Sequence, residues 1–198
     1  MKLERLRQSF EELARFTDEG EGINRLAYTE TERNARDFLI EQFECAGLTV
    51  RTDYAGNVIA RREGKFPDLP VVATGSHIDS VYAAGEFDGT AGVLVALEVM
   101  RSLADEGVET DHPLEVIIFA CEESARFGAS TLGSKAMTGR LDPAYTRSLA
   151  DKTGVTLMQA FEENGLDLEE VHLAMRFQDE IKAFVELHVE QGPVLEKQ

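Results

Sequence analysis

Three short clusters of histidine and carboxylate residues are the parts of this sequence best suited to chemistry. The first contains His77, Asp79 and, after a glycine-flanked turn, Asp88. A neutral imidazole nitrogen can bind a metal ion, and Asp79 is spaced to accept the other ring N–H. The two oxygens of Asp88 could bridge two ions. A histidine on its own would more often be a buried residue satisfied by hydrogen bonds, but its acidic neighbours favour a metal site.

The second cluster is the pair Glu122 and Glu123, which directly follows the apolar run LEVIIFAC. Two adjacent carboxylates at the end of a strand repel each other unless a positive charge neutralises them, and a metal ion would do so. One of them can then bind the ion while the other acts as general base towards a metal-bound water. An isolated Glu-Glu pair in so acidic a chain would instead be a solvated turn.

The third cluster is the segment ELHVEQGP, residues 186–193. If this segment is a strand, its alternation places Glu186, His188 and Glu190 on one face. His188 is the candidate metal ligand of the three. Gln191 could offer its amide to a polar substrate.

Each cluster follows a segment with the apolar pattern of a strand, at residues 70–74, 114–121 and 182–189. Two more strands are predicted at 48–54 and 57–61, and helices at 3–16, 29–43, 89–104, 132–137, 156–163 and 168–175. Strands that alternate with helices predict an α/β fold, with a mostly parallel sheet and helices on both faces. Ligands of such sheets bind beyond the carboxyl ends of the strands, so the three clusters should meet at one place.

The composition restricts the partners of the chain. Its 198 residues suit one domain, or one domain and part of another. The 37 acidic residues outnumber the 20 basic ones and give a net charge of −17, which argues against nucleic acid and anionic membranes. Cys45 and Cys121 are far apart, and neither a signal sequence nor a membrane-spanning run is visible. These features favour a reduced cytoplasmic protein.

The motifs GSHIDSVYAAGEFDGTAGVLVALE, FACEESARFG and ELHVEQGPVLE, in this order, resemble the amidase and carbamoylase branch of the M20 metallopeptidase-like hydrolases. That branch includes N-carbamoyl-L-amino-acid hydrolases, allantoate amidohydrolases and β-ureidopropionases. The resemblance extends from about Gly22 to the end of the chain. It implies a di-metal hydrolase domain that cleaves an amide or ureido C–N bond of a small molecule, such as an N-carbamoyl-L-amino acid or an allantoate-like substrate.

The resemblance also implies a role for each matching residue. The metal ligands are His77, His188, the bridging Asp88 and Glu123, the general base is Glu122, Asp79 orients His77, and Gln191 contacts the substrate. Two divalent ions, of Zn²⁺, Mn²⁺ or Co²⁺, are implied as cofactors. Relatives often hold the bridging aspartate through a cis peptide, so the bond between Asp88 and Gly89 is expected to be cis.

Two other interpretations stay open. One is a true M20 dipeptidase or aminoacylase, although those relatives often have a carboxylate where this chain has His188. The other is a catalytically inactive fragment that binds a metal ion or a partner.

The resemblance covers only the first part of a family member. It implies that residues 1–198 are the N-terminal portion of the catalytic domain, without the lid and dimerisation domain or the C-terminal catalytic segment. Full-length members are expected to be homodimers. One ion would keep three ligands here, while the other would keep only Asp88 and Glu123. We therefore expect the 198-residue chain to hold at most one ion tightly, to have little activity and to self-associate.

Overall fold

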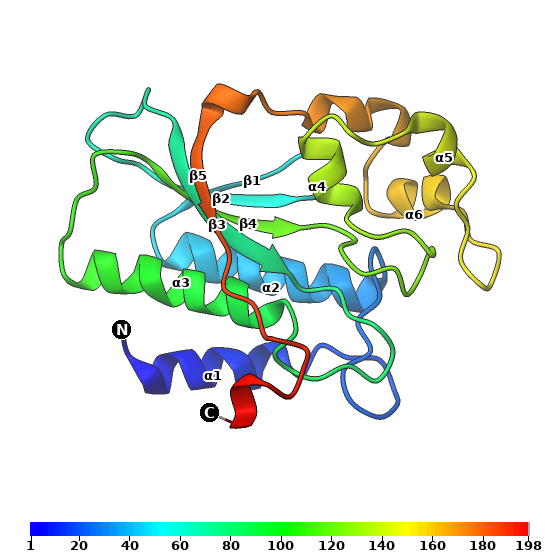
Figure 1. The fold of residues 1–198 in the computed structure, drawn as a ribbon, viewed down its shortest axis with the longest axis horizontal. Helices are drawn as coiled ribbons and strands as arrows, with labels where there is room; N and C mark the ends of the chain where they lie inside the picture. The colour runs from blue at the N-terminus through cyan, green and yellow to red at the C-terminus, as the bar shows by residue number, and fades with distance from the viewer. Residues whose placement is uncertain (198) are drawn as a thin grey trace.

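The computed structural model describes residues 1–197 and shows one sheet with helices around it (Figure 1). In chain order its elements are α1 (Leu3–Leu13), α2 (Glu30–Cys45), β1 (Thr49–Thr52), β2 (Val58–Arg62), β3 (Val71–His77), α3 (Thr90–Asp105), β4 (Leu114–Phe119), α4 (Leu132–Met137), α5 (Pro143–Arg147), α6 (Leu157–Glu163), the 3-10 helices η1 (Leu168–Ala174) and η2 (Gln178–Glu180), β5 (Ile181–Val185) and the 3-10 helix η3 (Leu195–Lys197).

The strands of the sheet lie in the order β1-β2-β4-β3-β5. β3 pairs in parallel with both β4 and β5, whereas β2 is antiparallel to β4 and β1 is antiparallel to β2. Within residues 1–197, β2 is therefore the strand that runs against the other four. The predicted α/β fold with a mostly parallel sheet is confirmed, and the carboxyl ends of β3, β4 and β5 lie at the same edge.

One face of the sheet is covered by α2 and α3, with α1 packed on α3 (Figure 1). The apolar sides of these helices contribute Leu39, Phe43 and Leu97 to a core that also contains Val58 and Val116 of the sheet. Burial of these side chains holds the helices against the strands, each fully buried large side chain contributing about 1.5–3 kcal/mol. This layer forms a rigid base beneath the carboxyl ends of the strands.

The opposite face of the sheet is only partly covered. There Met137 of α4 packs with Ile59 and Ile117, and α4, α5 and α6 gather beyond one end of the strands (Figure 1). Helices on both faces are thus present, but the β5 side of this face stays open. The open part forms the cleft described below.

The last strand is shorter than the sequence predicts. Its pairing with β3 ends at Thr74 and Val185, so the expected strand over residues 182–189 is wrong beyond Val185. Glu186, His188 and Glu190 therefore do not alternate on one strand face. The reason is that the chain leaves the ladder here and crosses towards α3. The predicted helix at 168–175 is a 3-10 helix rather than an α-helix.

Both cysteines are free. Burial raises the pKa of the Cys121 thiol well above its ordinary value, in keeping with a core residue rather than a nucleophile. No helix within residues 1–197 has both the length and the apolar character needed to cross a membrane.

Candidate metal centre

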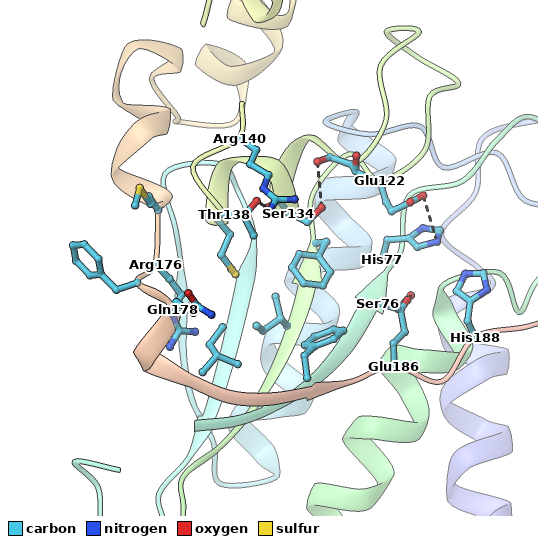
Figure 2. Close-up of a pocket in the computed structure, with 18 residues that line it drawn as sticks. Ser76, His77, Glu122, Ser134, Thr138, Arg140, Arg176, Gln178, Glu186 and His188 are labelled. Carbon is cyan, nitrogen blue, oxygen red and sulfur yellow. Dashed lines mark hydrogen bonds and ion pairs between the residues drawn. The ribbon is translucent and has the colours of Figure 1, made fainter. Parts of the chain in front are cut away.

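His77 ends β3 and is almost completely buried. Its Nδ1 lies 2.8 Å from the backbone oxygen of Asp79, which assigns the ring proton to that nitrogen. Nε2 then carries an available lone pair, and this nitrogen lies 3.9 Å from Oε2 of Glu122 (Figure 2). Two acceptors that face each other in this way are suited to a cation between them.

His188 and Asp88 form a second arrangement of this kind. Nδ1 of His188 lies 2.8 Å from the backbone oxygen of Val189, so Nε2 is again the free nitrogen. This Nε2 is 3.3 Å from Oδ1 of Asp88. Oδ1 is buried and has no hydrogen-bond partner within residues 1–197, whereas Oδ2 accepts from Nε2 of Gln191 at 2.7 Å. A buried carboxylate oxygen without a donor fits a metal ligand.

These residues lie in one place at the carboxyl edge of the sheet. One potential ligand atom from each of His77, Asp88 and His188 lies within 4.8 Å of the others, and the same is true of His77, Glu122 and Glu123. The rings of His77 and His188 are stacked, with centroids 6.0 Å apart. The structure groups Glu123 with His77 and Glu122, whereas the family resemblance implies that Glu123 shares an ion with Asp88. Histidine nitrogens with carboxylate oxygens are a donor set that fits Zn²⁺, Mn²⁺ or Co²⁺.

Asp79 has a different position from the one the sequence suggests. The backbone oxygen of Asp79 accepts the hydrogen bond from Nδ1 of His77, while the Asp79 carboxylate lies 3.7 Å from Nδ1. That carboxylate accepts the backbone N–H groups of Glu122 and Glu123 at 3.1 and 3.0 Å. Asp79 therefore anchors the loop that carries both glutamates. Burial raises the pKa of Asp79 to about 7, because the loss of water outweighs the nearby His77 and the two donors.

The loop after β4 is held on its other side by α4. The backbone N–H groups of residues 131–133, at the beginning of this helix, donate to the carbonyls of residues 120–122. Cys121 has a positive φ of 48°, which turns the chain so that the next two N–H groups face Asp79. Burial raises the pKa of Glu123, and its neighbour Glu122 raises it further. A cation would relieve this desolvation and repulsion.

Asn57 is a residue of the site region whose importance the sequence does not reveal. It is completely buried; its Oδ1 accepts the N–H of Ala120, and its Nδ2 donates to Oδ2 of Asp53 and to the carbonyl of Gly133. Asn57 thus ties β2 to both ends of the loop that carries the glutamates. The Gly56-Asn57 pair predicted only a turn, and nothing else in the sequence marks this contact.

The expected cis bond between Asp88 and Gly89 is wrong, because residues 1–197 contain no cis peptide. The sharp turn before α3 is made instead by Gly89, with φ 65° and ψ −45°. A Cβ on Gly89 would also lie 2.5 Å from the His77 ring. Glycine at this position therefore allows both the turn and the approach of Asp88 to His77.

A cleft of about 1050 Å³ opens from this centre across the uncovered face of the sheet. His77, Glu122 and His188 line one end of it (Figure 2). Its floor is apolar and includes Phe119 and Phe184, whose ring centroids lie 5.6 Å apart. A cleft of this size accommodates a small organic molecule beside the metal ligands.

Comparison with known proteins identifies the family. The sequence model of the family described as "Peptidase family M20/M25/M40" matches residues 65–198, which is more than half of the chain. The chain belongs to this family. The matched range contains all three clusters of the candidate metal centre.

Relatives of this M20 chain have names from the amidohydrolase branch. It is 45% identical over 195 residues to "N-carbamoyl-L-amino-acid amidohydrolase" of Paenarthrobacter aurescens, covering 98% of this chain and 47% of that protein. It is 34% identical over 189 residues to "Allantoate deiminase" of Arabidopsis thaliana, covering 93% of this chain and 36% of that protein. The first relative is thus named for hydrolysis of N-carbamoyl-L-amino acids, and the second for deimination of allantoate.

A solved structure supports the fold of the M20 chain. A hydantoinase/carbamoylase family amidase from Burkholderia ambifaria superimposes with a TM-score of 0.90 at 38% identity, over 100% of this chain and 47% of that one. The M20 chain therefore spans about half the length of the carbamoylase and of this amidase.

Proposed function

We propose that this chain provides a two-metal centre for an amidohydrolase that cleaves a linear amide or ureido C–N bond. The observation that carries the proposal is the buried Oδ1 of Asp88, which has no donor in the described chain and faces the free Nε2 of His188 at 3.3 Å. The names of the relatives support an N-carbamoyl-L-amino acid or an allantoate-like molecule as the substrate.

Four residues would hold the ions. His77, Asp88 and His188 form one group of possible ligands, and Glu123 belongs to a second group that shares His77. When bound, two divalent ions polarise the substrate carbonyl and lower the pKa of a water molecule towards about 7. Asp88 would bind one ion through its free Oδ1, and a bridge to the second ion would require Oδ2 to exchange its hydrogen bond with Gln191 for that ion.

Glu122 is suited to be the general base. Its side chain is about a third exposed and lines the cleft, close to the His77 ring, while its backbone is fixed by Asp79. It takes a proton from the attacking water, whose oxygen adds to the carbonyl carbon, and it returns the proton to the leaving nitrogen as the C–N bond breaks. For a carbamoyl substrate, this cleavage leaves a carbamic acid, whose loss of carbon dioxide breaks the second C–N bond, so that the products are an amino acid, carbon dioxide and ammonia.

Metal analysis of the chain tests the first part of the proposal. After exposure to Co²⁺ and dialysis, we expect His188→Ala to retain clearly less metal than the unaltered chain, because it removes a ligand. His172→Ala is the matched control, since His172 is exposed and its Nδ1 contacts only the carbonyl of Glu169 in its own helix. Equal metal in His188→Ala and the unaltered chain would contradict the proposed centre.

A substrate panel tests the reaction. The chain would be extended with the remaining half of its carbamoylase relative and assayed with N-carbamoyl amino acids, allantoate and dipeptides. We expect turnover of the first two classes. Hydrolysis of dipeptides alone would instead support the peptidase interpretation.

A further inference from the structure

The segment that carries His188 is not held by the sheet. Pairing of β5 with β3 ends at Val185, and the next residues are exposed. His188 nevertheless has its Nε2 within 3.3 Å of Asp88 and its ring stacked on His77. Some other contact must therefore fix the path of residues 186–188.

The contact nearest to the end of β5 is a hydrogen bond between Ser76 and Glu186. The hydroxyl of Ser76 donates to Oε1 of Glu186 at 2.6 Å, and the Ser76 side chain is buried (Figure 2). Ser76 directly precedes His77, and Glu186 lies two residues before His188. A single short hydrogen bond to the Glu186 side chain thus joins the two segments that bear the histidines.

The same segment lies against α3 at a position that only glycine fits. A Cβ on Gly92 would be 2.6 Å from the carbonyl oxygen of Leu187 and 2.7 Å from Cβ of Ser76. The missing side chain lets residues 186–188 descend onto the junction of β3 and α3. At this depth the carboxylate of Glu186 reaches the buried hydroxyl.

We infer that Ser76 and Glu186 form a positioning pair that sets the place of His188 in the metal centre. This inference rests on the proposed metal function and deepens it. Glu186 is not part of either group of potential ligands found within residues 1–197. It acts through Ser76, as an outer partner that orients a ligand segment. Loss of such partners lowers metal affinity by about 10- to 100-fold in other metal sites.

The test is a Co²⁺ titration of the metal-free chain, followed by visible absorption and by calorimetry. Ser76→Ala and Glu186→Ala should each bind Co²⁺ about 10- to 100-fold more weakly than the unaltered chain. Glu186→Gln keeps an oxygen that accepts from Ser76, so it should bind within a few-fold of the unaltered chain. The double variant Ser76→Ala/Glu186→Ala should bind Co²⁺ no more weakly than the single variant with the lower affinity, because each single substitution already removes the same hydrogen bond.

Controls separate positioning from general damage. Glu196→Ala removes an exposed glutamate from the same terminal segment and should leave Co²⁺ affinity unchanged. Circular dichroism and thermal melting of the metal-free variants check that each one folds. Glu186→Gln provides a second reading if either alanine variant unfolds.

The outcomes are distinct. Wild-type affinity in Ser76→Ala and Glu186→Ala would overturn the inference and leave the metal centre intact. Equal weakness of Glu186→Gln and Glu186→Ala would also overturn it, because the charge of Glu186 rather than the bond to Ser76 would then matter. Failure of the unaltered chain to bind Co²⁺ at all would overturn the proposed function itself.

Discussion

Gly89 lies against the ring of His77, so that a Cβ on this glycine would be 2.5 Å from His77 Nε2, the nitrogen that we propose binds a metal ion. Gly89 also has a φ of 65°. We predict that Gly89→Ala destabilises the chain by about 1–3 kcal/mol through its strained positive-φ backbone, with overpacking adding about 1–3 kcal/mol. It should also abolish tight Co²⁺ binding. Urea denaturation and Co²⁺ titration measure the two effects.

Gly107 is the matched control for this prediction. It lies just beyond the other end of α3 with a φ of 62°, and nothing lies within 4 Å of the Cβ it lacks. Gly107→Ala should therefore show the backbone effect alone and bind Co²⁺ normally. Equal Co²⁺ affinity in the two variants would show that contact with His77 does not matter.

Substitution of the two adjacent glutamates should separate base from ligand. In the extended protein, Glu122→Gln should keep its metal and lose turnover by about 10²- to 10⁴-fold, because it removes only the base. Glu123→Gln should lose metal as well as activity. Both variants should preserve the loop, since Asp79 holds the backbone N–H groups rather than the side chains. Lost metal in Glu122→Gln with retained metal in Glu123→Gln would reverse the two roles.

The raised pKa of Asp79 predicts a pH effect on the metal-free chain. Burial raises this pKa from an ordinary 3.8 to about 7. Between these values the folded chain binds more protons at Asp79 than the unfolded chain does. The contribution of Asp79 to the free energy of unfolding is therefore greatest below pH 4 and is lost as the pH rises to about 7, by up to about 4 kcal/mol.

Asp79→Asn isolates this contribution, because other carboxylates titrate in the same range. Urea denaturation in the presence of a chelator at several values between pH 4 and pH 7.5 gives the free energy of unfolding of each protein. As the pH rises, the free energy of unfolding of the unaltered chain should fall relative to that of Asp79→Asn. A difference that stays constant with pH would refute the prediction.

The outer edge of β5 predicts self-association of the 198-residue chain. β5 lies at the end of the sheet, and Phe184 and Val185 are 40% and 65% exposed. An exposed apolar edge strand can pair with another chain, and lysine on such an edge opposes pairing. Val185→Lys should weaken association by about tenfold, or 1.4 kcal/mol. Val99→Lys, at an exposed position on α3, should have little effect. Sedimentation velocity measures both, and a monomer at all concentrations would contradict the prediction.

The sequence predicts the proximity of the candidate ligands where this proximity follows from local patterns. His77, Glu122 and Glu123 follow apolar strands whose carboxyl ends must meet in a parallel sheet, so their proximity can be predicted without a structure. The position of α3 follows in the same way from its apolar repeat and from the glycine-flanked turn that contains Asp88.

The supporting contacts could not be predicted, because they join residues that only the folded chain brings together. The Asp79 carboxylate accepts from N–H groups 43 and 44 residues away, and Asn57 accepts from Ala120, 63 residues away. No local pattern specifies these partners. The end of β5 was also missed, since an alternating sequence does not reveal where its neighbouring strand stops pairing.

The bond between Ser76 and Glu186 spans 110 residues, and this separation has a consequence for the order in which the molecule is assembled. β3 and β4 are both complete before β5 is synthesised, and closure of so long a loop in a parallel sheet is a slow step. We therefore expect His77, Asp88 and the two glutamates to come together on the growing chain before His188 arrives. A metal ion present during synthesis would meet the acidic part of the centre first, and the docking of the last strand would determine when that ion becomes trapped.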